Sequence, residues 1–116
     1  MHSNIKRLPI IQRGNLIIDQ QCYTVTVDGT SYNLPSKEMK LLCLLAEHPG
    51  WVLTKKQIFN SIYDENDIGV MNDVYVDNRI YCLIRDLRKQ LETDPSHPKY
   101  IHTIRGVGYK FIVPEE

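Results

Sequence analysis

The side chains best suited to chemistry lie on one face of a segment in the second half of the chain. From Val76 to Leu91, apolar residues recur at the spacing of a helix, and polar residues occupy the opposite side. That opposite side carries Asn78, Arg79, Cys82, Arg85, Asp86 and Lys89. Arginine, lysine and asparagine donate hydrogen bonds that phosphate oxygens and base edges accept, so the chemistry on offer is recognition of a nucleic acid.

A second candidate group follows this helix at the turn 105–108, between two alternating apolar runs at 100–104 and 109–113. The alternation predicts a β-hairpin. Arg105 at the turn has the length and charge to reach a DNA backbone or the flanking minor groove. Two plainer interpretations stay open, because a mixed-charge helix face is commonly just solvated and Tyr109 can simply pack on the helix.

The remaining reactive side chains do not form a pattern with a known chemistry. The three cysteines, Cys22, Cys43 and Cys82, contain no C-x-x-C pair, and the four histidines lack metal-ligand spacing. We therefore expect no disulfide framework, no metal and no cofactor, with these residues serving as packing or surface groups. The sequence also lacks a Ser/His/Asp set, paired catalytic carboxylates and a phosphate-cradling glycine loop, so we do not expect an enzyme.

The first third of the chain should build a small antiparallel sheet. Short β-branched runs between residues 10 and 33 are separated by turn residues, and the Asp28-Gly29 pair between two of them is a strong hairpin signal. At Ser36 the apolar period changes to that of a helix. We expect Ser36 to cap this helix, Glu38 to meet the positive end of its dipole, and the helix to end at 48–50.

Two more helices should follow. Thr54 and Gln57 have the spacing of a capping box, which predicts a second helix with Ile58, Phe59, Ile62 and Tyr63 facing inward. A polar, acidic loop then runs from residue 64 to 72. The third helix should start at Asn72 or Asp73 and stop before the proline-containing segment 93–98. Its inward stripe is Val76, Ile80, Leu83, Ile84, Leu87 and Leu91.

Length and composition predict one domain, which we place at residues 10–113 after a linker at 1–9. No apolar run is long enough for a membrane span, and the N-terminus lacks a signal peptide, so we expect a soluble, cytoplasmic protein with no membrane partner. The 14 basic and 14 acidic residues cancel, which argues mildly against nucleic-acid binding. Charge is nevertheless segregated, with a basic C-terminal stretch and an acidic central loop.

Several linked segments resemble one protein family. Residues 94–110 closely resemble the C-terminus of OmpR/PhoB-type response-regulator effector domains. Residues 87–92 look like the end of that family's third helix, and residues 34–57 resemble its first two helices. The resemblance runs from about Leu16 to Phe111. It implies an α+β winged helix-turn-helix domain with an N-terminal four-stranded antiparallel sheet, a three-helix core and a C-terminal β-hairpin wing.

The resemblance also implies a function and a set of roles. The expected function is sequence-specific binding of double-stranded promoter DNA by a two-component transcriptional response regulator, with the third helix in the major groove. Arg105 and Tyr109 belong to the wing, and Arg105 would enter the minor groove. Phosphate contacts would come from Tyr63, Arg85, Arg88 and Thr103. The acidic loop, with Glu65, Asp67 and Asp73, would contact RNA polymerase.

The third helix departs from the family pattern. Tyr81 and Leu83 stand where an aspartate and a histidine are usual, and Asp86 replaces a commonly basic base-reading residue. Asp86 could accept a hydrogen bond from cytosine N4, or it could repel phosphates. We expect a receiver domain to precede this domain in the parent protein, and tandem copies to bind a repeated site. The alternative is a winged-helix protein-interaction module that has lost base-specific reading.

Overall fold

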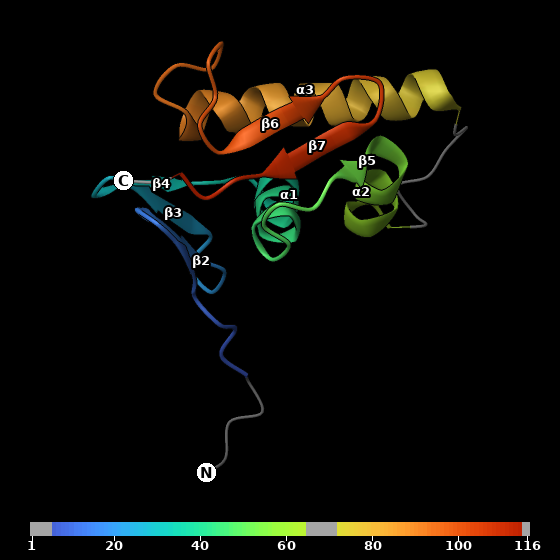
Figure 1. The fold of residues 1–116 in the computed structure, drawn as a ribbon. Coiled ribbons are helices and arrows are strands. Elements are labelled where there is room, and N and C mark those ends of the chain that lie inside the picture. The colour runs from blue at the N-terminus through green and yellow to red at the C-terminus, as the bar shows by residue number, and fades with distance from the viewer. Residues whose placement is uncertain (1–5, 65–71, 115–116) are drawn as a thin grey trace.

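The computed structural model describes residues 6–64 and 72–114 of the chain. Four strands come first, β1 (Ile11–Arg13), β2 (Leu16–Asp19), β3 (Thr24–Val27) and β4 (Thr30–Asn33). Three helices, α1 (Ser36–Ala46), α2 (Lys55–Ile62) and α3 (Asp73–Leu91), are followed by the hairpin of β6 (Ile101–Ile104) and β7 (Gly108–Phe111). Figure 1 shows α3 lying along the hairpin, and both α1 and α2 pack against α3. The expected sheet, three helices and hairpin are all confirmed.

The N-terminal sheet is antiparallel throughout, in the order β1-β2-β3-β4. Leu16 and Ile18 pair with Val27 and Val25 across β2 and β3, and all four side chains are buried. Ile17 between them points to solvent. The Asp28-Gly29 turn connects β3 to β4 with φ of 49° and 85°, so the hairpin signal is confirmed with the left-handed backbone that this turn requires.

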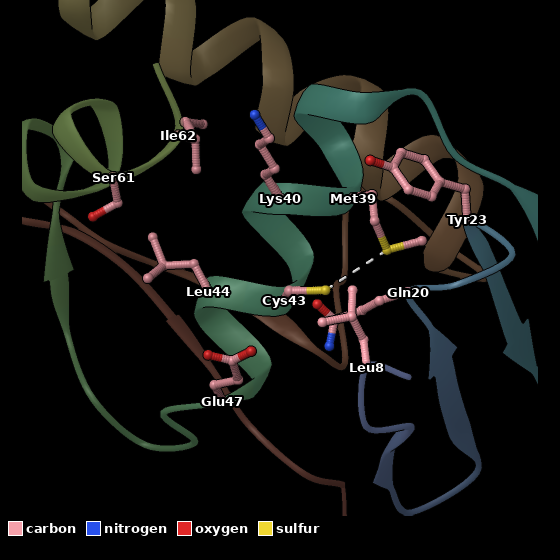
Figure 2. Close-up of a pocket in the computed structure, with 10 residues that line it drawn as sticks. All are labelled: Leu8, Gln20, Tyr23, Met39, Lys40, Cys43, Leu44, Glu47, Ser61 and Ile62. Atoms are coloured by element: carbon pink, nitrogen blue, oxygen red, sulfur yellow. Dashed lines mark hydrogen bonds between the residues drawn. The ribbon is translucent and has the colours of Figure 1, made fainter. Parts of the chain in front are cut away.

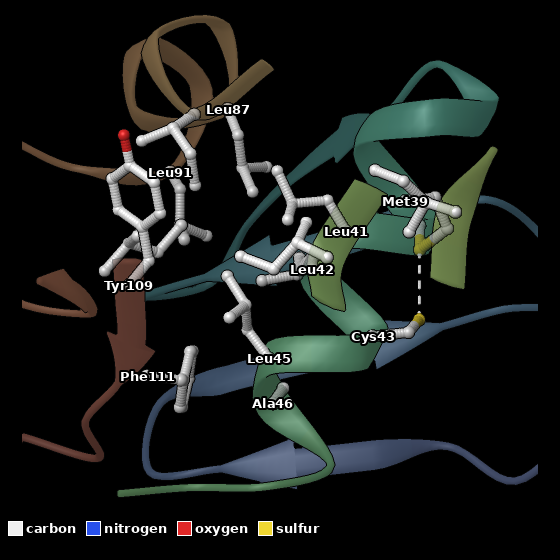
Figure 3. Close-up of a cluster of buried hydrophobic side chains, with 14 of the residues drawn as sticks. Met39, Leu41, Leu42, Cys43, Leu45, Ala46, Leu87, Leu91, Tyr109 and Phe111 are labelled. Carbon is white, nitrogen blue, oxygen red and sulfur yellow. Dashed lines mark hydrogen bonds between the residues drawn. The ribbon is translucent and has the colours of Figure 1, made fainter. Parts of the chain in front are cut away.

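Helix α1 is the centre of the core. Leu41, Leu42 and Leu45 are fully buried, and Figure 3 shows them between the N-terminal sheet, the end of α3 and the β7 side chains Tyr109 and Phe111. At this helix one expectation was wrong, because Ser36 does not cap it. Pro35 is the N-cap and forms no side-chain capping bond. Ser36 is already the first helical residue, so its hydroxyl is past the position from which a cap reaches the next turn's amides.

The starts of α2 and α3 agree with the expected caps. Thr54 Oγ1 accepts from Gln57 N at 3.1 Å and Gln57 Oε1 accepts from Thr54 N at 2.9 Å, which completes the capping box. Asn72 caps α3 by accepting from Tyr75 N at 2.8 Å. The inward stripe of α3 is buried except for Leu83, which packs only partly against the core.

Among the described residues, no helix is both long and apolar enough to span a bilayer.

A short strand, β5 (Leu53–Thr54), pairs with the hairpin to form a second sheet in the order β5-β7-β6. The sequence did not predict this strand. Thr54 pairs with Gly108 at the start of β7. A Cβ atom added to Gly108 would overlap the carbonyl oxygen of Leu53. Gly108 is therefore required by the close approach of two backbones, and this approach attaches the hairpin to the base of α2.

This close approach predicts the effect of Gly108→Ala. The added methyl group would push β5 away from β7, and we expect a loss of about 2 to 3 kcal/mol in the free energy of unfolding. Urea unfolding followed by circular dichroism measures it. Val107→Ala, at an exposed position of the same turn, is the control and should change stability by less than about 0.5 kcal/mol. Equal midpoints for Gly108→Ala and the unmodified chain would show that the backbones do not meet.

Candidate nucleic-acid interface

Most of the helix residues that the sequence marks for nucleic-acid recognition lie on the outward face of α3, whereas Arg88 faces the wing. Arg85 and Lys89 are exposed, as are Asn78 and Arg79 one to two turns earlier. The half-buried members of the set are Cys82, Asp86 and Arg88. The hairpin lies along the same helix (Figure 1), so helix and wing present their polar groups side by side.

Acidic groups balance part of the positive charge on this face. Arg85 Nε donates to Asp86 Oδ1 at 3.2 Å, and this bond raises the pKa of the Arg85 guanidinium. Lys55 at the start of α2 lies 3.6 Å from the carboxylate of Asp77. The balance of charge in the whole chain is therefore repeated on α3, where basic and acidic side chains alternate instead of forming a purely basic surface.

Tyr63, at the C-terminal end of α2, has two cations close to its ring. Its ring stacks on Phe59, with 4.5 Å between the ring centroids. Lys37 Nζ lies 4.6 Å from the centre of the Tyr63 ring, and the Arg79 guanidinium lies 5.7 Å from it on the α3 side. Lys37 also donates to Ile62 O at 3.2 Å.

The hydroxyl group of Tyr63 is buried and has no hydrogen-bond partner among the described residues. Interaction with this phenol raises the pKa of Arg79, yet the two groups are not aligned for a hydrogen bond. A buried hydroxyl without a partner costs free energy, so its position on a ring with two cations nearby favours a site completed by an anionic oxygen.

Arg88 is more engaged within the protein than the sequence suggests. Its Nη2 donates to Ile101 O at 2.9 Å and to Thr103 Oγ1 at 2.8 Å, and its guanidinium lies 5.8 Å from the centre of the Tyr109 ring. Burial lowers the pKa of this arginine. The structure thus brings the expected residues Arg88, Thr103 and Tyr109 together, in a cluster that ties α3 to β6.

Glu92, which follows the last residue of α3, is a functional candidate that sequence reasoning missed. It is 6% exposed. Its carboxylate accepts from the backbone amides of Lys99 at 2.8 Å, Tyr100 at 3.1 Å and Ile101 at 2.9 Å. The available signal was its position, since a carboxylate at the negative end of a helix dipole is unfavourable unless other donors bind it.

The turn of the hairpin presents Arg105 to solvent beside Gly106, whose φ is 77°. Val107 N donates to Ile104 O at 2.9 Å and closes the turn. No hydrogen bond or ion pair from residues 6–64 or 72–114 holds the Arg105 side chain. Its guanidinium is therefore available to an external anion.

Of the expected polymerase-contact residues, Glu65 and Asp67 lie outside the described residues. Asp73 is the first residue of α3 and is exposed. Its carboxylate lies at the positive end of the helix dipole, where a negative charge is stabilised.

The cysteines occupy packing and surface positions. Cys43 is buried in α1, where its thiol donates to Met39 Sδ at 3.7 Å beside a shallow hollow (Figure 2). Burial, followed by the charge of Glu47, raises the pKa of this thiol to about 11. Cys22 is exposed. Within the described part of the chain, no group of three or more His, Cys, Asp or Glu side chains could hold a metal ion.

Comparison with known proteins places this architecture among transcriptional regulators. A family described as "Transcriptional regulatory protein, C terminal" matches residues 29–111. YcbL, an uncharacterised transcriptional regulatory protein of Bacillus subtilis, is 39% identical over 101 residues, which cover 87% of this chain and 42% of YcbL. AfsQ1 of Streptomyces coelicolor is 33% identical over 103 residues, covering 88% of this chain and 43% of that protein. The chain therefore spans less than half the length of these relatives.

Solved structures agree with the sequence matches. The DNA-binding domain of Klebsiella pneumoniae RstA, determined in complex with the RstA box, has a TM-score of 0.76 and 28% identity, covering 90% of this chain and 98% of that chain. DrrB of Thermotoga maritima, a response regulator described as an OmpR/PhoB homolog, has a TM-score of 0.72 and 35% identity. That match covers 89% of this chain and 44% of DrrB.

Proposed function

Since the chain belongs to the OmpR/PhoB-type family of transcriptional regulatory protein C-terminal domains, we propose that it is the DNA-binding effector domain of a two-component response regulator. The observation that carries this proposal is the joint surface of α3 and the β6–β7 wing, where Arg85, Arg88 and Lys89 of the helix line one hollow together with Thr103 and Tyr109 of the wing. Its similarity to the RstA domain bound to the RstA box supports the same conclusion. A binding role of this kind needs no catalytic centre.

In this proposal α3 enters the major groove, which is about 12 Å wide and accepts a single helix. Asn78, Cys82, Asp86 and Lys89 on its outward face would read base edges, with Arg79 beside them and Arg85 on a phosphate. Arg105, which no described residue holds, would reach into the adjacent minor groove. The Arg85–Asp86 pair supports a target sequence that differs from those read by relatives with a basic residue at position 86.

Phosphate contacts would flank this reading surface. The Tyr63 hydroxyl, which has no partner among the described residues, lies on a ring with Lys37 and Arg79 close to its centre, and this positive surrounding suits a phosphate oxygen. Thr103 and Tyr109 on the wing would form a second backbone contact. Arg88 would take part through its position in the same cluster, because its guanidinium already binds Ile101 and Thr103.

Further partners belong to the whole regulator. We propose that a receiver domain precedes this domain in the parent protein, since the relatives are more than twice its length. The segment from Glu65 through Asp67 to Asp73 would contact RNA polymerase. Two copies of the domain would bind a repeated DNA site in tandem.

The direct test is selection of bound duplexes from a random DNA pool, followed by affinity measurement at about 50 and about 200 mM salt. We expect enriched sequences and a steep fall in affinity as salt rises, because phosphate contacts release counterions. No enrichment and a flat salt dependence would contradict DNA binding and support the alternative of a protein-interaction module, which the interleaved acidic groups Asp77 and Asp86 would favour.

Arg105→Ala should weaken binding to the selected duplex by about 1 to 3 kcal/mol, because the substitution removes the charged group of the wing tip. Fluorescence anisotropy with labelled duplex measures the change. Arg7→Ala is the matched control, since Arg7 is also exposed but lies in the N-terminal segment that precedes β1, outside the proposed interface. Equal losses in the two variants would remove Arg105 from the interface.

Tyr63→Phe separates binding from stability. The hydroxyl group has no hydrogen-bond partner among residues 6–64 and 72–114, so its removal should leave the free energy of unfolding unchanged or slightly higher. If the hydroxyl binds a phosphate, the same variant should bind the selected duplex about 10- to 150-fold more weakly, because one hydrogen bond to a charged group contributes about 1.5 to 3 kcal/mol. Unchanged DNA affinity would exclude this hydroxyl from the phosphate contacts.

A further inference from the structure

Strand β6 is the edge strand of the second sheet, and its outer edge is bound by side chains of α3. Its inner edge pairs with β7, where Ile112 N donates to Tyr100 O at 2.8 Å. Ile101 N donates to Glu92 Oε2 at 2.9 Å, and Ile101 O accepts from Arg88 Nη2 at 2.9 Å. One helix thus binds both backbone groups of the same strand residue.

The Glu92 carboxylate forms hydrogen bonds with more backbone groups of this segment than Arg88 does. It accepts from three successive amides, those of residues 99–101, and it is 6% exposed. A buried carboxylate with three amide donors is held in one geometry, because any rotation leaves a charge or an amide unpaired. Arg88 lies in the last turn of α3 and Glu92 directly follows the helix, four residues later, so the two side chains hold β6 at two neighbouring points.

We propose that Glu92 is a positioning residue for DNA recognition, which fixes the β6–β7 wing on α3 and thereby sets where Arg105 meets the DNA. This inference rests on the proposed DNA binding. Arg105 directly follows β6, whose four residues extend about 13 Å from the end that Glu92 and Arg88 bind to the turn. A modest rotation of β6 about that end would therefore move Arg105 by several ångströms. Such a shift is enough to break a hydrogen bond between Arg105 and the DNA groove.

The test is a double-mutant cycle on the 116-residue chain with a duplex selected from the random pool. Glu92→Gln keeps the shape of the side chain but turns one acceptor oxygen into a donor that faces backbone amides. We expect Arg105→Ala to reduce affinity at least 5-fold in the unmodified chain and less than 2-fold in the Glu92→Gln background. Glu92→Gln alone should reduce affinity by about as much as Arg105→Ala alone.

Glu47→Gln is the matched control, because it neutralises a carboxylate at the end of α1, away from the wing. The full Arg105→Ala effect should persist in that background. The inference is overturned if Arg105→Ala keeps its full effect in the Glu92→Gln background, or if Glu92→Gln binds as tightly as the unmodified chain. A purely structural role for Glu92 would lower the fraction of folded protein without changing the effect of Arg105→Ala on the folded fraction.

Circular dichroism at low temperature reports whether each variant is folded. If Glu92→Gln does not fold, Glu92→Asp replaces it in the cycle, since aspartate keeps the charge but is one methylene too short to reach all three amides. The inference is then tested in the same way, by the effect of Arg105→Ala in the Glu92→Asp background and by the affinity of Glu92→Asp alone. If the unmodified chain selects no duplex, the proposed function fails, whereas selective binding with independent effects of the two substitutions overturns only the role of Glu92.

Discussion

The fold depends on the requirement that α1 be covered on every side except one narrow strip. Apolar residues occupy most of its circumference, and Leu41, Leu42, Leu45 and Ala46 are completely inaccessible to solvent. No single neighbour could cover such a helix, so the N-terminal sheet, α2, α3 and β7 all pack against it (Figure 3). Burial of this kind supplies most of the favourable free energy of folding. It also fixes the direction of α3, whose Leu87 and Leu91 meet α1.

The core places α3, and polar contacts add to apolar packing in placing the wing. The hairpin contributes Ile101, Tyr109 and Phe111 to the core, and its polar attachments include the β5 pairing at Gly108, the bond from Gly50 N to Phe111 O and the bonds from Glu92 and Arg88. These contacts are directional, whereas apolar packing tolerates small shifts. The division explains how relatives with different surface residues keep one arrangement of helix and wing. It also leaves the outward side of α3 free to vary, and Asp86 is an example of that variation.

Sequence patterns predicted the parts of the fold that are determined by interactions between residues close together in the chain. The Asp28-Gly29 turn, the Thr54–Gln57 capping box and the apolar stripe of α3 each involve residues close in sequence, and each was confirmed. Strand β5 was missed because its two residues become a strand only by pairing with β7, more than 50 residues later. The role of Ser36 was wrong by one position, since Pro35 can begin the helix without a side-chain cap.

In the candidate site too, the features that depend on residues close in sequence were predicted, and those that depend on distant contacts were not. Periodicity correctly collected the polar residues of α3 on one face, and the resemblance added Tyr63, Thr103 and Arg88. Sequence alone could not show that Arg88 binds the wing strand or that the Tyr63 hydroxyl is buried and unpaired, because both facts depend on contacts between distant segments. Glu92 escaped for the same reason, since its three amide donors lie seven to nine residues beyond it.

The central claim is that α3 and the wing form one DNA-binding surface, and mapping of backbone amide NMR shifts during titration with a selected duplex tests it most directly. The largest shifts should fall on residues 78–89 and on the turn 105–108, together with the Tyr63 region, while the hollow beside α1 in Figure 2 stays unchanged. Shifts concentrated at that hollow or on the N-terminal sheet, with α3 and the wing unaffected, would contradict it.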